Sequence, residues 1–156
     1  MADSEDHAGV GFPPPFVFLG FLLIGIAADR RLGWTFGIAP AVRWPLAIAL
    51  LVIGGFLIAG AFVRFRRAGT DPEPWKPASA LVTTGIYRLT RNPMYLGMAT
   101  VTLGLALAFG GWASLAGLAL AVIAIDRAVI AKEEPYLERR FGEDYRAFKA
   151  RVRRWI

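Results

Sequence analysis

Two clusters of polar residues in this sequence have side chains suited to chemistry, and each lies at the edge of an apolar stretch. The first cluster consists of Arg91, Asn92, Pro93 and Tyr95, directly before or at the start of a long apolar run. The second is the carboxylate pair Glu133 and Glu134, which follows a further apolar run. Carboxylates accept hydrogen bonds from hydroxyl and ammonium groups, and an arginine can bind a carboxylate in a bidentate pair. A carboxylate whose pKa is raised by burial could also take a proton.

Each cluster also has an ordinary structural interpretation. Asn92 and Pro93 would simply cap and start a helix, with Arg91 directed toward lipid phosphates. The carboxylates at 133–134 would be a solvated pair, or the acidic first turn of a helix that starts at Pro135. Three tyrosines would be interfacial aromatic residues: Tyr87, Tyr95 and Tyr136. The chemical interpretation is favoured because both clusters are expected at one place.

Helices long enough to enter a bilayer would position these clusters. Hydrophobic residues make up 56% of the 156 residues and are gathered in blocks, which is unusual for a soluble domain. The uncharged run of residues 44–63 is about as long as a ~30 Å hydrocarbon core requires. Residues 16–28 are a shorter run, whose helix we expect to begin near residues 13–15 and to reach the interface through Arg30 and Arg31.

The predicted fold class is all-α, a polytopic membrane protein with about four transmembrane helices. We expect the whole chain, 1–156, to form a single membrane domain. Its consecutive parts would be an acidic tail (1–12), two transmembrane helices (13–63), a cytoplasmic loop (64–93), a transmembrane hairpin (94–130) and a cytoplasmic or interfacial C-terminal helix (131–156). Gly55 and Ala59, four residues apart, would permit close approach of a neighbouring helix, within the chain or between chains.

The hairpin is the element that would bring the two clusters together. Apolar runs of similar length, residues 94–109 and 112–125, flank Gly110 and Gly111 and predict two helices joined by a tight turn. Because both arms rise about 1.5 Å per residue, Arg91, Asn92 and Tyr95 should lie near Glu133 and Glu134. Basic residues are densest in the loop of residues 64–91 and in the C-terminal section, so the positive-inside rule places this end in the cytoplasm.

The C-terminal section is amphipathic. Its apolar residues recur at steps of three and four: Leu137, Phe141, Tyr145, Phe148, Val152 and Trp155. This spacing predicts one helix at the membrane surface, interrupted at Gly142.

Composition excludes several kinds of site. The chain has no cysteine, so disulfides and thiolate chemistry are ruled out. His7 is the single histidine and lies in the acidic tail, where we expect a disordered bystander and therefore no metal site. The net charge of +6 arises from arginines that flank apolar helices, which indicates orientation signals and lipid contacts and not nucleic acid binding.

The two clusters also carry a resemblance to a known family. The stretch GIYRLTRNPMYLGM, followed after one hairpin by EEPYLERRFGEDYRAFKARVRRWI, resembles the isoprenylcysteine carboxyl methyltransferase and phospholipid methyltransferase superfamily. The resemblance covers about residues 85–155 and implies an integral membrane enzyme that uses S-adenosylmethionine. The residues that it places at the cofactor are Tyr87, Arg91, Asn92, Pro93, Tyr95, Leu96, Gly97, Glu133, Glu134 and Tyr145. The residues to which it gives a catalytic role are Glu133, Glu134 and Arg151.

One position departs from the family pattern, because Asn92 stands where a histidine is usual. An amide still offers a donor and an acceptor, but it cannot exchange a proton near neutral pH. We therefore expect methyl transfer to a lipidic acceptor that enters from the bilayer, either an isoprenylcysteine-like carboxylate or a phospholipid amine. Two alternatives are a nicotinamide-dependent membrane reductase and a non-catalytic membrane protein with a lipid-binding polar cluster. The oligomeric state is left open.

Overall fold

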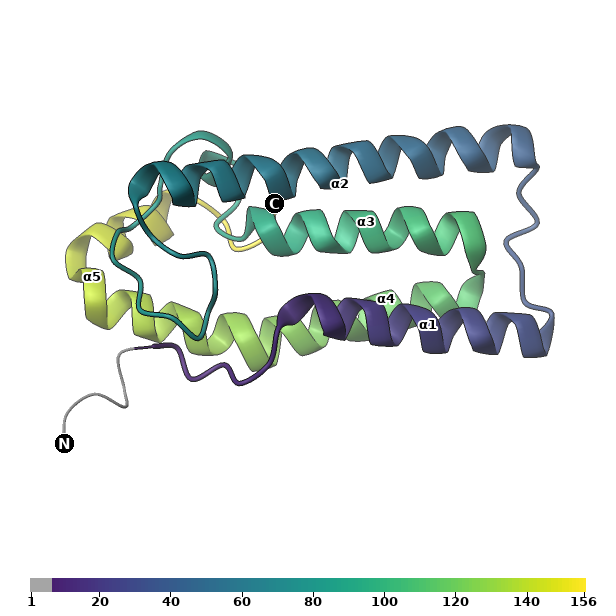
Figure 1. Cartoon of the computed structure of the whole chain (residues 1–156), viewed down its shortest axis with the longest axis horizontal. Helices are drawn as coiled ribbons and strands as arrows, with labels where there is room; N and C mark the ends of the chain where they lie inside the picture. Colours follow the sequence, from purple (N-terminus) through teal and green to yellow (C-terminus); the bar gives the residue numbers. More distant parts are fainter. Residues whose placement is uncertain (1–6) are drawn as a thin grey trace.

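The computed structural model describes residues 7–156. In this part of the chain helices are joined by loops, and there is no strand (Figure 1). The helices are α1 (Pro14–Leu32), α2 (Pro40–Ala68), the 3-10 helix η1 (Gly85–Arg88), α3 (Pro93–Phe109), α4 (Trp112–Ile125), the π-helical turn η2 (Asp126–Ile130) and α5 (Ala131–Arg151). The predicted all-α class is confirmed, as is a first helix that begins at residues 13–15.

Two helices of the described chain are long and apolar enough to cross a membrane. They are α2 and the run Trp112–Arg151, which joins α4, η2 and α5 and bends at Gly142; α3 is apolar but shorter. The part before the bend, residues 112–141, is about 45 Å long, which exceeds the ~30 Å thickness of the hydrocarbon core. Its apolar residues precede Ala131, whereas α5 is rich in charge, so we expect α5 outside the hydrocarbon. Four spans remain a prediction.

The helices lie lengthwise in two pairs, with α2 along α3 and α1 along α4 (Figure 1). Gly110 and Gly111 join α3 to α4 at one end of the bundle, and α5, the loop after α2, the first described residues and the C-terminus lie at the other (Figure 1). The predicted hairpin is therefore present, and it places residues 91–95 and 133–134 at the same end.

Glycines allow the close approach of α2 and α3. A Cβ on Gly54 would lie 2.7 Å from the carbonyl oxygen of Gly97, and one on Gly97 would lie 2.8 Å from the carbonyl oxygen of Gly54. Gly55 and Ala59 are both exposed, so of the two alternatives for them the contact within the chain is absent and the contact between chains stays a prediction. The side chains of neighbouring residues on a helix point about 100° apart, so Gly54 faces α3 whereas Gly55 does not.

These neighbours make a matched pair of substitutions. Gly54→Ala should lower the free energy of unfolding by about 1–3 kcal/mol, because its methyl group meets backbone that cannot move without separating the helices. Gly55→Ala has open space around the added methyl group and should be neutral or stabilising by up to about 1 kcal/mol. Thermal unfolding of both variants in detergent measures the difference. Equal midpoints would contradict the assigned contact.

A buried carboxylate fixes the turn at the far end of the bundle. Asp29 of α1 is 4% exposed, and it accepts hydrogen bonds from the backbone N–H groups of Gly111 (2.6 Å), Ala113 (2.8 Å) and Ser114 (3.0 Å). The hydroxyl of Ser114 donates a fourth. Asp29 thus caps the first turn of α4, which has no capping side chain of its own.

The C-terminal section bends and folds back on the protein. Gly142 interrupts α5 with φ 52°, as predicted. The apolar stripe packs mainly against Ala61, Val82 and Tyr87, and its place at a membrane surface stays a prediction. Helix α5 also ends at Arg151, and the extended backbone at Val152 turns Trp155 toward a different cluster, around Val129 and Ile130. The prediction of one continuous apolar stripe up to Trp155 was therefore wrong.

The N-terminal segment is also ordered from the first described residue onward. Val10 is 1% exposed in the apolar cluster with Phe18 and Tyr95, and Nδ1 of His7 accepts a hydrogen bond from the N–H of Gly9. The expectation of a disordered tail at His7 is therefore wrong, and residues 1–6 lie outside the described chain.

Candidate active site

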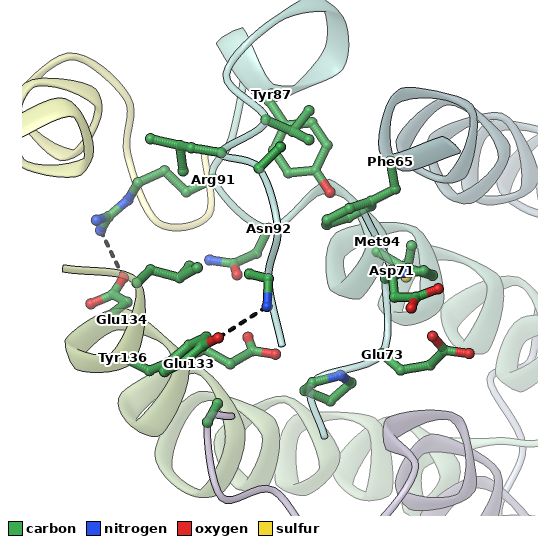
Figure 2. A pocket seen from close by; sticks show the side chains of 18 of the residues that line it. Phe65, Asp71, Glu73, Tyr87, Arg91, Asn92, Met94, Glu133, Glu134 and Tyr136 are labelled. Atoms are coloured by element: carbon green, nitrogen blue, oxygen red, sulfur yellow. Dashed lines mark hydrogen bonds and ion pairs between the residues drawn. The ribbon is translucent and has the colours of Figure 1, made fainter. Parts of the chain in front are cut away.

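A cavity of about 120 Å³ lies where the two predicted clusters meet (Figure 2). This is several times the volume that one water needs, so it is larger than a packing defect. Its walls come from the end of α2, the loop of residues 71–82, η1, the start of α3, both arms of α5 and the N-terminal segment. Elements distant in sequence therefore form one cavity, whose lining combines apolar side chains with charged ones.

A chain of charged groups crosses one wall of the cavity. Glu134 is 7% exposed and pairs with Nη2 of Arg91 at 3.0 Å. Arg154 binds the same carboxylate in a bidentate manner, with Nη2 at 2.6 Å from Oε2 and Nε at 3.0 Å from Oε1. Nη1 of Arg154 lies 3.2 Å from Asp126. Two arginines thus bind Glu134 and hold it in place.

The last residues of the chain fasten the start of α3 to this wall. The carbonyl oxygen of Arg153 accepts the N–H of Arg91 at 2.9 Å. The carbonyl oxygen of Arg154 accepts the Thr90 hydroxyl and the Asn92 side-chain amide, both at 3.0 Å. Pro93 is in the first turn of α3, as its ordinary interpretation predicts, but the Asn92 side chain does not cap that helix. Its amide binds the chain end instead.

Arg91 retains unused hydrogen-bonding capacity. Its side chain is 10% exposed, and its Nε and Nη1 are buried without a hydrogen-bond partner. Buried donors of a charged group are costly to leave unpaired. Because Arg91 also lines the cavity, its free donors identify a place for an anionic group of a ligand.

Glu133 faces the cavity without a cation beside it. Its Oε1 accepts the hydroxyl of Tyr95 at 2.7 Å, and no ion pair to Glu133 is found among the described residues. Burial raises its pKa to about 7; the Tyr95 hydrogen bond opposes this shift, and the charge of Glu134 adds to it. Glu133 can therefore gain or lose a proton near neutral pH.

Tyrosines form the rest of the wall. Tyr87 is 6% exposed and packs edge-on against Phe65, with ring centroids 5.7 Å apart. Tyr145 is 2% exposed, and burial raises its pKa to about 12, so it stays neutral. The hydroxyl of Tyr136 accepts the N–H of Ala78 at 3.0 Å and so ties the 71–82 loop to α5 (Figure 2).

Most of the residues predicted at the cofactor line the cavity: Tyr87, Arg91, Asn92, Tyr95, Glu133, Glu134 and Tyr145. Pro93, Leu96 and Gly97 do not line it, and Gly97 packs against α2, so contact of these three with a cofactor stays a prediction. Arg151 is exposed, and its Nε donates only to the carbonyl oxygen of Ala147, so its predicted catalytic role is not supported.

The sequence-based prediction missed other residues of the site. Arg154, three residues after Arg151, is the arginine of the chain end that reaches the site. It lies beyond the end of α5 and binds Glu134. Asp71, Glu73 and Lys76 line the mouth of the cavity, with Lys76 3.0 Å from Glu73 and 3.5 Å from Asp71. A run of alternating charge in a proline-rich loop was the only signal for these three.

The sequence model of a family described as phospholipid methyltransferase matches residues 42–144, about two thirds of the chain. The chain belongs to the phospholipid methyltransferase family. An uncharacterized protein from Haemophilus influenzae is 38% identical over 63 residues, which are 40% of this chain and 100% of that protein. No solved structure matches the chain.

Membership in the phospholipid methyltransferase family confirms the resemblance inferred from the motifs and identifies the chain as a membrane methyltransferase. Methyltransferases of this family generally depend on S-adenosylmethionine. The matched region contains the cavity residues from Phe65 to Leu137, whereas Tyr145 and Arg154 lie beyond it.

Proposed function

We propose that the protein transfers a methyl group from S-adenosylmethionine to the amine head group of a lipid. The observation that carries the proposal is Glu133, which lines the cavity half-buried; burial raises its pKa to about 7, and no described residue forms an ion pair with it. An ammonium group must lose a proton before it can accept a methyl group, and Glu133 is placed to take it. A carboxylate acceptor would need no base and would be repelled by ionised Glu133.

The residues of the cavity suit S-adenosylmethionine, which supplies a methyl group activated on a sulfonium ion. Arg91 would hold the carboxylate of the cofactor through Nε and Nη1, its two buried and unpaired donors. The aromatic faces of Tyr87 and Tyr145 would bind its adenine ring or its cation. Burial keeps both phenols neutral.

The charges around the cavity also favour a cationic head group. Four carboxyl groups line it, Asp71, Glu73, Glu133 and Glu134, against two basic groups, Lys76 and Arg91. Tyr95 donates to Oε1 of Glu133 and fixes its orientation toward the cavity. In this proposal the acceptor's hydrocarbon tail stays in the bilayer, and its head group enters a pocket on the cytoplasmic face.

Binding of labelled S-adenosylmethionine to the detergent-solubilised protein tests the cofactor site. Arg91→Ala should weaken binding about 10- to 100-fold, because a charge-assisted pair is lost. Arg154 still holds Glu134 in this variant, so it should remain folded by circular dichroism. Arg67→Ala removes an exposed arginine of α2 outside the cavity and should bind like the wild type.

Three results would contradict the proposal. Wild-type protein that fails to bind S-adenosylmethionine would favour a non-catalytic lipid-binding role. Preferential binding of NADPH would favour a nicotinamide-dependent reductase. Unchanged binding by Arg91→Ala would show that the cofactor lies elsewhere.

A further inference from the structure

A second recess lies between the two arms of α5 and shares Glu134 and Arg154 with the wall of the candidate active site. Gly142 interrupts the helix, so that residues 131–141 and 143–151 form arms at an angle. The recess, here called the α5 groove, is open to solvent and has a volume of about 550 Å³. Its charged lining residues are Glu134, Glu138, Arg139, Arg146, Lys149 and Arg154.

The α5 groove has an excess of positive charge. Its four basic side chains face two carboxylates, and Glu134 is already held by Arg91 and Arg154. Glu138 is the other carboxylate that lines the groove, and Glu143, which does not line it, pairs with Arg146 at 2.7 Å. Glu138 lies 3.3 Å from Nζ of Lys149 and 3.8 Å from Nη1 of Arg146.

Arg139 is the basic residue that remains available. It is exposed at the groove, and among the described residues it has no ion-pair partner. It lies on the first arm, whereas Arg146 and Lys149 lie on the second. An anion between the arms could thus be bound from both sides.

We propose that the α5 groove binds a phosphate group. Arginine presents paired N–H donors that match phosphate oxygens, and lysine adds a point charge. The groove begins at Ala131, directly after the apolar segment of residues 112–130, which is the level at which lipid head groups meet a spanning helix. The phosphate is that of an acidic phospholipid head group or of a dissolved ion, and the two sources offer the same chemistry to the groove.

A bound phosphate would join the two arms of α5 and so stabilise the folded state. Thermal unfolding of the full chain in a neutral detergent measures this effect. The additions would be dioctanoyl phosphatidic acid, dioctanoyl phosphatidylcholine at the same concentration, and inorganic phosphate at matched ionic strength. Phosphatidic acid should raise the unfolding midpoint by about 3 °C, and most of this shift should be lost in the double variant Arg139→Ala/Lys149→Ala.

Neither substituted residue lines the candidate active site, so the double variant should still bind S-adenosylmethionine. This binding distinguishes an error in the phosphate proposal from an error in the proposed function. Arg67→Ala controls for loss of a basic charge outside the groove and should keep the full shift. A shift with phosphatidic acid alone identifies a lipid phosphate, and an equal shift with inorganic phosphate identifies the dissolved ion. The proposal is overturned if neither produces a shift, if phosphatidylcholine matches phosphatidic acid, or if the double variant responds like the wild type.

Discussion

Glu133→Gln should reduce the rate of methyl transfer to a lipid amine by about 100- to 10,000-fold, the usual contribution of a positioned base. Glutamine has nearly the same shape and can still accept the Tyr95 hydroxyl, so the fold and the cavity should be kept. It cannot take a proton. The measurement is transfer of a labelled methyl group from S-adenosylmethionine to phosphatidylethanolamine in mixed micelles.

The pH dependence gives a second readout of the same residue. A general base acts in its ionised form, and burial raises the pKa of Glu133 to about 7. The wild-type rate should therefore increase as the pH rises through about 7 and then level off, whereas the residual rate of Glu133→Gln should lack this step. A merely structural role for Glu133 would not remove the step selectively.

Glu143→Gln is the matched control, because Glu143 is an exposed carboxylate of the same helix outside the cavity. It should show wild-type activity and the wild-type pH profile. Undiminished activity of Glu133→Gln toward the amine would refute the proposed base. So would a wild-type protein that methylates an isoprenylcysteine analogue but no lipid amine.

The juxtaposition of the two clusters followed from the sequence because it needs only a glycine turn and two arms of similar length. Their individual pairing did not follow. Successive helical residues point about 100° apart, so Glu134 meets Arg91 while Glu133 meets Tyr95. This difference gives the two carboxyl groups different roles, and it depends on helix rotation, which composition and spacing leave undetermined.

The contribution of the chain end could not be predicted for a different reason. Arg151, Arg153 and Arg154 are equivalent in a basic run, and helical periodicity would extend α5 to the last residue. The helix instead ends at Arg151, and extended backbone carries Arg154 to Glu134 and Asp126. Only the folded position of the chain end distinguishes one arginine from the next.

Asp29→Ala should lower the free energy of unfolding by about 3–5 kcal/mol, the largest effect on stability that we expect. The substitution leaves the first N–H groups of α4 buried without an acceptor, and removes a negative charge from the positive end of the helix. In detergent the unfolding midpoint should fall by about 10 °C. This role could not be predicted from the sequence, because Asp29 stands beside Arg30 and Arg31, as an interfacial residue would.

A double-mutant cycle shows whether the contact itself is responsible. Ser114→Ala removes one of the four hydrogen bonds to Asp29 and should cost about 1 kcal/mol in the wild-type background. In the Asp29→Ala background the same change should cost almost nothing, since the acceptor is gone. Asp71→Ala, which removes a half-exposed carboxylate, should change stability by no more than about 0.5 kcal/mol. Equal costs of Ser114→Ala in both backgrounds would show that Asp29 stabilises the hairpin by some route other than capping α4.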